Sequence, residues 1–151
     1  MTKHNAPLNS LYFDHNLLAS FDNTGSIYVT AGVRSEVSSK NSLAHSKLTT
    51  VPYVDVKPLL GKGVLLGATN HEKKGRIDLI DLEGRKVSFK LTIQEKIYRL
   101  EISPCEKIVL TNLSTTLIHA YSINKFELLF KISGYVQDNS IMQMLIGGHN
   151  R

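Results

Sequence analysis

The sequence of 151 residues contains one cysteine, no tryptophan and only four prolines. A single cysteine, Cys105, excludes an intrachain disulfide and is typical of a reducing compartment. No stretch reaches the roughly 18 consecutive apolar residues that a membrane-spanning helix needs. The first ten residues lack the apolar core of a secretory signal. We therefore expect a protein of the cytoplasm or nucleus with no membrane partner.

Positive charge is in modest excess, with 18 Lys and Arg against 13 Asp and Glu, a net charge of +5. Between His71 and Lys107 acidic and basic residues are mixed and form no basic stripe. Most of these charges are therefore interpreted as solvated strand faces and turns. The excess keeps RNA or a ribonucleoprotein open as an alternative partner.

Residue patterns of enzymes are lacking. Cys105 has no base near it in sequence, although a nucleophile needs one. The six histidines show no pair at metal-ligand spacing, and His119 is interpreted as a packed or hydrogen-bonded side chain. Gly61-Lys62-Gly63 lacks the flanking residues of a phosphate-binding loop. We therefore predict no catalytic residue, metal site or cofactor, and no enzymatic activity.

A four-strand pattern recurs along the chain. From Ile97 to Ile132 the segments IYRLEIS, IVLTNL, LIHAYSI and ELLFKI are short, apolar or alternating, and separated by turn residues. The template fits earlier segments too, with first strands starting near Leu8, Val51, Ile97 and Ile141, which are 43, 46 and 44 residues apart. Such a unit at this period is typical of a β-propeller blade. The predicted fold is all-β: one partial β-propeller over 1–151, with four-stranded antiparallel blades at 8–50, 51–96 and 97–140 and one strand of a fourth at 141–147.

Turn residues mark the expected hairpins at Asn23–Gly25, Lys74–Gly75, Glu83–Gly84 and Ser103–Pro104. The Ser/Thr/Lys-rich segment 33–50 is expected to be an exposed loop, with the outer strand of the first blade near 43–49. Three blades do not close a ring, since propellers close with four to eight. We therefore expect open blade faces, which another chain or further blades would cover.

Several residues resemble the WD-repeat form of the blade. Ser103-Pro104 resembles the SPDG-type turn between the first two strands, and Asp81-Leu82 lies where such blades end their third strand with Trp-Asp. Ile80 and Tyr121 take the place of the tryptophan, so the usual buried His–Ser–Asp–Trp hydrogen-bond set cannot form. We therefore expect apolar packing alone to hold these blades together.

A narrower resemblance covers residues 97–150 and is carried by Asn112-Leu113, by Lys131-Ile132-Ser133-Gly134 and by Gly147-Gly148. These positions resemble the later blades of the WD-repeat subunit of the GID/CTLH ubiquitin ligase. The third-strand tryptophan of that family is absent, and Ile146 replaces the aromatic residue before Gly147. The resemblance implies a scaffold subunit of a ligase complex without catalytic residues of its own.

Propeller blades usually form binding platforms, so the expected function is a non-catalytic protein–protein interaction scaffold, with RNA or ribonucleoprotein binding as the alternative. The candidate partner-binding residues are Lys73, Lys74 and Arg76 at one hairpin, and Tyr98 and Arg99 at the start of the third unit. Cationic side chains beside an aromatic ring suit an interface.

Overall fold

The computed structural model describes residues 6–14, 17–31, 45–49, 51–60, 62–114 and 117–133. These residues form twelve strands and no helix, arranged as three four-stranded antiparallel sheets in chain order. No helix in this part of the chain is long and apolar enough to cross a membrane. The predicted fold class is confirmed by the three sheets. The predicted strand at 141–147 lies outside the described residues.

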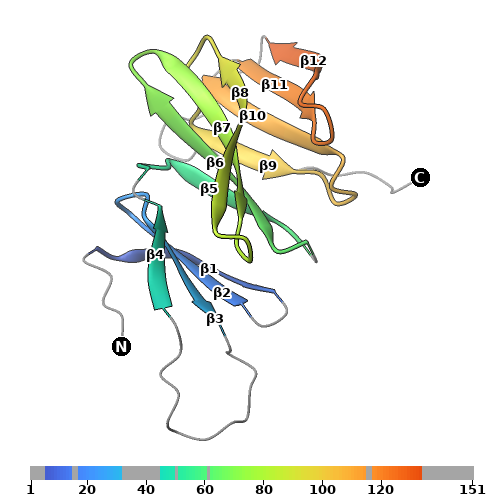
Figure 1. Ribbon diagram of the computed structural model, residues 1–151. Helices are drawn as coiled ribbons and strands as arrows, with labels where there is room; N and C mark the ends of the chain where they lie inside the picture. Colours follow the sequence, from blue (N-terminus) through green and yellow to red (C-terminus); the bar gives the residue numbers. More distant parts are fainter. Residues whose placement is uncertain are drawn as a thin grey trace, which may run out of the picture.

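Each sheet is a meander in which successive strands pair antiparallel, and we call the sheets blades 1 to 3. Blade 2 lies between blades 1 and 3 (Figure 1). Blade 1 consists of β1 (Leu8–Asp14), β2 (Leu17–Asp22), β3 (Ile27–Ala31) and β4 (His45–Thr49). Blade 2 consists of β5 (Asp55–Leu59), β6 (Val64–His71), β7 (Lys74–Asp81) and β8 (Lys86–Ile93). Blade 3 consists of β9 (Arg99–Ile102), β10 (Ile108–Ser114), β11 (Leu117–Ser122) and β12 (Leu128–Ser133).

One expected hairpin turn lies elsewhere. The turn between β6 and β7 is formed by Glu72 and Lys73, so its placement at Lys74–Gly75 was wrong. Glu72 adopts a positive φ of 55°, and the turn therefore forms without glycine. Gly75 serves a different purpose, because a Cβ added there would lie 2.5 Å from Ile97 Cγ1. The first strand of blade 2 also begins later than expected, after a linker of residues 51–54.

Apolar side chains fill both seams between the blades. Successive residues of a strand point to opposite faces, so β6 directs Leu65 toward blade 1 and Leu66 toward blade 3. Leu65 and its cross-strand neighbour Ile80 pack in the cluster shared with blade 1. Leu66 and Ile77 pack in the cluster shared with blade 3. Burial on both faces explains why the central strands are continuous apolar runs.

The expectation that apolar packing alone holds the blades is wrong, because buried polar groups also tie the seams. The Asp78 carboxylate on β7 is fully buried and accepts hydrogen bonds from Arg76 Nε at 2.8 Å and Nη2 at 2.6 Å. It also accepts the hydroxyl hydrogen of Tyr53, which lies in the linker between blades 1 and 2, at 2.9 Å. Burial and the Asp78 charge raise the pKa of Tyr53, and the hydrogen bonds to Asp78 raise the pKa of Arg76. A buried charge is thus paired and hydrogen-bonded, as its desolvation requires.

The first strands of neighbouring blades are joined in the same way. The Asp55 carboxylate of β5 accepts the backbone N–H of Leu100 in β9 at 2.8 Å. The hydroxyl group of Tyr12 in β1 donates to the carbonyl oxygen of Val56 in β5. Burial raises the pKa of Asp55, while its backbone hydrogen bonds counteract that rise. Side chains of β1 and β5 therefore bond the backbone of the adjacent blade.

Because the strands alternate in direction, each blade presents two ends. We call one the linker end: it carries the turn 23–26, the linker 51–54, the turn Glu72–Lys73 and the linker 94–98. The opposite end carries the turn residues 60 and 62–63 and the turns 82–85, 103–107 and 123–127. The predicted partner-binding residues belong to the linker end.

Candidate functional site

Four of the five predicted partner-binding residues lie exposed at the linker end of blades 2 and 3. Lys73 lies in the β6–β7 turn, and Lys74 is the first residue of β7. Tyr98 is 49% exposed at the end of the linker 94–98, and Arg99 opens β9. The cationic turn and the aromatic ring thus come from adjacent blades and share one end of the molecule.

Asn70 connects these two segments. Its side-chain amide donates to the backbone carbonyl of Ile97 at 2.8 Å, and its side-chain carbonyl accepts the Ile97 N–H at 2.8 Å. Gly75, two residues after Lys73, leaves the room in which Ile97 packs. The turn at Lys73 and the residues next to Tyr98 are therefore held by a reciprocal pair of hydrogen bonds and by close packing.

Arg76 lies apart from the other four residues. Its guanidinium pairs with buried Asp78 and lies on the face of β7 directed toward blade 1. Its side chain remains 43% exposed, but its hydrogen bonds are used within the protein. The structure thus gives Arg76 a stabilising contact in the seam.

Sequence reasoning missed Val54 and Asn70. Val54 N–H donates to the carbonyl of Ala68 at 2.8 Å, and Tyr98 N–H donates to that of Asn112 at 2.8 Å. Val54 and Tyr98 therefore occupy the same position in successive blades, and both side chains are exposed. Their spacing along the chain, close to the repeat period, is the signal that would have found Val54. Asn70 carried no such signal, because its partner lies 27 positions away.

The residues considered for catalysis, Cys105 and His119, lie in different parts of blade 3. Cys105 is exposed in the turn 103–107 at the opposite end, where its thiol lies 3.4 Å from Ser103 Oγ. The hydrogen bond with Ser103 lowers the pKa of Cys105. His119 is buried, and its Nδ1 lies 3.0 Å from Tyr121 Oη, which confirms the prediction of a packed, hydrogen-bonded histidine. Among the described residues, no group of three His, Cys, Asp or Glu side chains is placed to hold a metal ion.

Comparisons with known proteins identify the fold. No protein-family model and no curated protein match this sequence. Among solved structures, Hsv2 of Kluyvelomyces marxianus superimposes with a TM-score of 0.61 at 14% identity, over 87% of this chain and 38% of its own. The β-propeller domain of Cps50 (Swd1) of Myceliophteria thermophila gives 0.62 at 13% identity, over 88% of this chain and 49% of its own. The computationally designed Ika4 protein gives 0.61 at 15% identity, over 88% of this chain and 76% of its own.

Three successive four-stranded meanders packed face to face, which superimpose on part of a propeller domain, define a partial β-propeller. Hsv2 and Cps50 are natural proteins, and at 14% and 13% identity they show the fold of this chain alone. The chain spans less than half the length of these two natural proteins.

Proposed function

We propose that this protein is a non-catalytic protein-interaction scaffold of the WD40-propeller type, acting in a multiprotein complex of the cytoplasm or nucleus. Propellers generally present loops at their ends as binding platforms, and function resides in such sites rather than in the fold. A similar chain belongs to the mitotic checkpoint complex, with a TM-score of 0.60 at 14% identity. That protein is an assembly component, and we propose the same general role here.

The proposed binding surface is the linker end of blades 2 and 3, formed by Lys73, Lys74, Tyr98 and Arg99 together with Val54. The observation that carries this proposal is the reciprocal hydrogen-bonded pair between Asn70 and Ile97, which holds the cationic turn beside the segment that bears Tyr98. A preorganised surface loses less entropy on binding than a flexible one. Cationic groups around exposed apolar side chains favour an acidic segment of a partner protein that also carries apolar residues.

Fluorescence polarisation with a panel of labelled acidic peptides that contain apolar residues tests this surface. The variant Lys73→Glu/Lys74→Glu should weaken the tightest peptide by about tenfold or more, since it replaces attraction by repulsion. The matched control is Lys86→Glu/Lys90→Glu on the outer strand β8, where both lysines are exposed. Equal loss in both variants would show only a dependence on net charge and would contradict the proposed surface.

RNA binding remains the outcome that would replace this proposal. A labelled short RNA that binds the protein with a steep salt dependence, while every peptide in the panel fails, would favour the nucleic-acid alternative. The interspersed acidic and basic side chains between His71 and Lys107 favour a protein partner.

The finer proposal is membership of a ubiquitin-ligase complex, supported by the resemblance over 97–150. Its Asn112-Leu113 pair is buried in β10, where it contributes to blade packing. Co-purification of the tagged protein with a GID/CTLH ligase tests membership. A complex of other composition would contradict it.

We also propose that additional blades, from the same chain or another, cover the outer faces of blades 1 and 3. Ile27 on β3 and Ile77 on β7 each pack against the next blade. Ile118 takes the place of Ile77 in blade 3, because Ile77 pairs with Ala68 and Ile118 pairs with Asn112, whose carbonyl groups accept the N–H groups of Val54 and Tyr98. Beside it on the outer strand, Phe130 and Ile132 are exposed. The apolar pattern of the seams thus continues onto the outer face of blade 3.

A further inference from the structure

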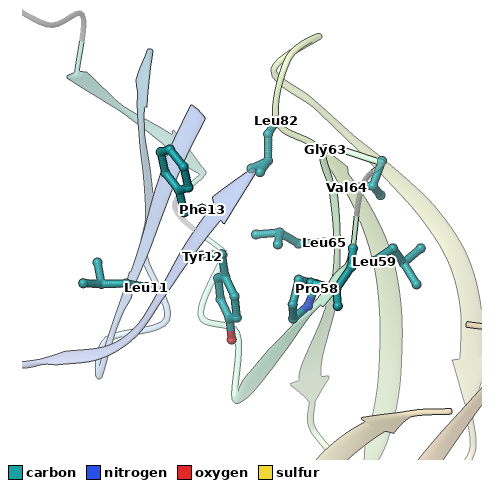
Figure 2. A pocket seen from close by; sticks show the side chains of 10 residues that line it. Leu11, Tyr12, Phe13, Pro58, Leu59, Gly63, Val64, Leu65 and Leu82 are labelled. Carbon is teal, nitrogen blue, oxygen red and sulfur yellow. The ribbon is translucent and has the colours of Figure 1, made fainter. Parts of the chain in front are cut away.

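A pocket of about 180 Å³ lies at the opposite end of the molecule, in the seam between blades 1 and 2. Figure 2 shows Tyr12 of β1 on one side of it and Pro58 and Leu65 of blade 2 on the other, with Leu82 above them in this view. Leu60, which also lines the pocket, is 72% exposed. The lining is mostly apolar, and its exposed residues are Leu60 of blade 2 and Leu11 and Phe13 of β1.

The pocket has the size of one large apolar side chain. An engineered apolar cavity of about 150 Å³ accommodates a benzene molecule. A volume of about 180 Å³ therefore accommodates the ring of a phenylalanine or the branched side chain of a leucine. Exposed leucine at the rim adds apolar surface that such a side chain would cover.

A second, wider pocket of about 640 Å³ occupies the equivalent position one blade further on. The equivalence follows from the backbone: Leu82 N–H donates to the carbonyl of Gly63 at 3.0 Å, and Ile123 N–H donates to that of Lys107 at 2.9 Å. Gly63 and Leu82 line the first pocket, whereas Lys107 and Ile123 line the second. The two pockets therefore repeat with the blades, and they lie on either side of Leu60 and Lys62.

The second pocket differs from the first in charge. Its charged lining residues are Lys62, Glu106 and Lys107. The Glu106 carboxylate already accepts the Leu60 N–H and lies 3.9 Å from Lys62 Nζ. Lys62 is 58% exposed, so its ammonium group remains accessible to another ligand. With two cations and one engaged carboxylate, this pocket favours a negatively charged group.

We propose that the opposite end is a second docking surface, separate from the linker end, which binds an extended acidic segment of a partner protein. A large apolar side chain of that segment enters the pocket lined by Tyr12, Pro58 and Leu65. A carboxylate further along the segment lies in the second pocket beside Lys62 and Lys107. Leu60 and Lys62 then lie between the two anchor points.

The test uses an array of short synthetic peptides that carry one phenylalanine or leucine and one glutamate at variable separation. Matched peptides carry lysine in place of the glutamate. The tightest peptide is then measured by fluorescence polarisation against Leu60→Ser and Lys62→Ser/Lys107→Ser. Controls are Phe89→Ser, an exposed apolar residue of β8, and the linker-end variant Lys73→Glu/Lys74→Glu.

We expect binding of glutamate peptides over lysine peptides, and a loss of about tenfold with Leu60→Ser, as for an interface anchor. A several-fold loss is expected for Lys62→Ser/Lys107→Ser, and no change for either control. No preference for glutamate, or equal losses in Phe89→Ser, would overturn the proposal. Loss only in the linker-end variant would assign the peptide to the linker end and overturn this second surface. If no peptide binds and Leu60→Ser instead reduces self-association in light scattering, the occupant is a second copy and the proposal fails.

Discussion

Replacing Asp78 by alanine removes the acceptor at the centre of the seam between blades 1 and 2. The fully buried carboxylate accepts two hydrogen bonds from Arg76 and one from Tyr53. Breaking a buried ion pair by removing one partner costs about 3–5 kcal/mol. We expect a value near the lower limit, about 3 kcal/mol, because Arg76 is 43% exposed and regains water. Since domains of this kind are stable by about 5–15 kcal/mol, the loss is a large share of the total.

The assay is urea unfolding followed by far-ultraviolet circular dichroism, because the chain has no tryptophan for fluorescence. Tyr53→Phe removes the hydrogen bond to the charged Asp78 carboxylate and should cost about 1.5–3 kcal/mol. The matched control is Asp81→Ala, three residues further along the same strand. The Asp81 carboxylate accepts one solvent-exposed hydrogen bond, from the Gly84 N–H. This control substitution should cost less than about 1 kcal/mol.

A double-mutant cycle between Tyr53→Phe and Asp78→Ala should give a coupling energy of about 1 kcal/mol or more, since the two side chains are in contact. If Asp78→Ala is no more destabilising than Asp81→Ala, or the cycle shows no coupling, the polar tie contributes nothing. The seam would then be held by apolar packing, as the sequence alone suggested.

Three further predictions concern the same seams. Alkaline pH should destabilise the protein: because burial and Asp78 raise the pKa of Tyr53 above its ordinary 10.0, its contribution is complete below pH 10 and is lost as the pH rises. The urea midpoint of Tyr53→Phe should therefore fall less across pH 10 than that of the wild type, and an equal fall would contradict this cause. Gly75→Ala should cost about 1–3 kcal/mol in thermal unfolding through overpacking, because its Cβ would lie 2.5 Å from Ile97 Cγ1. Gly84→Ala is the near-neutral control, because its Cβ would come nearest to the end of the Asp81 side chain rather than to packed core atoms, and equal costs would refute the steric reason. Asn70→Ala should cost about 1–3 kcal/mol by leaving buried backbone groups without a partner, and should speed hydrogen exchange at the Ile97 amide. Unchanged exchange there would show that the reciprocal bonds do not protect this linker.

The blade period could be predicted because the apolar pattern of each strand indicates whether its faces are buried. β6 and β7 are buried on both faces, so their apolar runs mark them as strands without knowledge of the rest of the chain. The position of one turn was predicted wrongly, because Lys74–Gly75 has the composition of a turn. The chain instead turns at Glu72, which adopts a positive φ.

The polar ties between the blades could not be predicted, because they join residues distant in sequence. Asp78 sits in the segment RIDLID, where alternation alone suggests an exposed charge. Its partner Tyr53 lies 25 positions earlier, in a linker. Of the proposed binding residues, Lys73 and Tyr98 lie at one end through the contacts of Asn70 and Gly75 with Ile97, which depend on the packing of two blades. Arg76 was grouped with them because it lies two residues after Lys74. Its side chain, however, lies on the face of β7 that is directed toward blade 1.

The most direct test of the open arc of blades is the molar mass of the 151-residue chain in solution, measured by multi-angle light scattering at micromolar concentration. An open arc should associate through its outer faces. Exposed Leu11 and Phe13 on β1, and Phe130 and Ile132 on β12, should make the measured mass exceed the 16.8 kDa of one chain. The variant Phe13→Ser/Phe130→Ser should return the mass toward one chain. A stable, monodisperse species of 16.8 kDa for the unaltered chain would contradict the open arc and its proposed role as a scaffold.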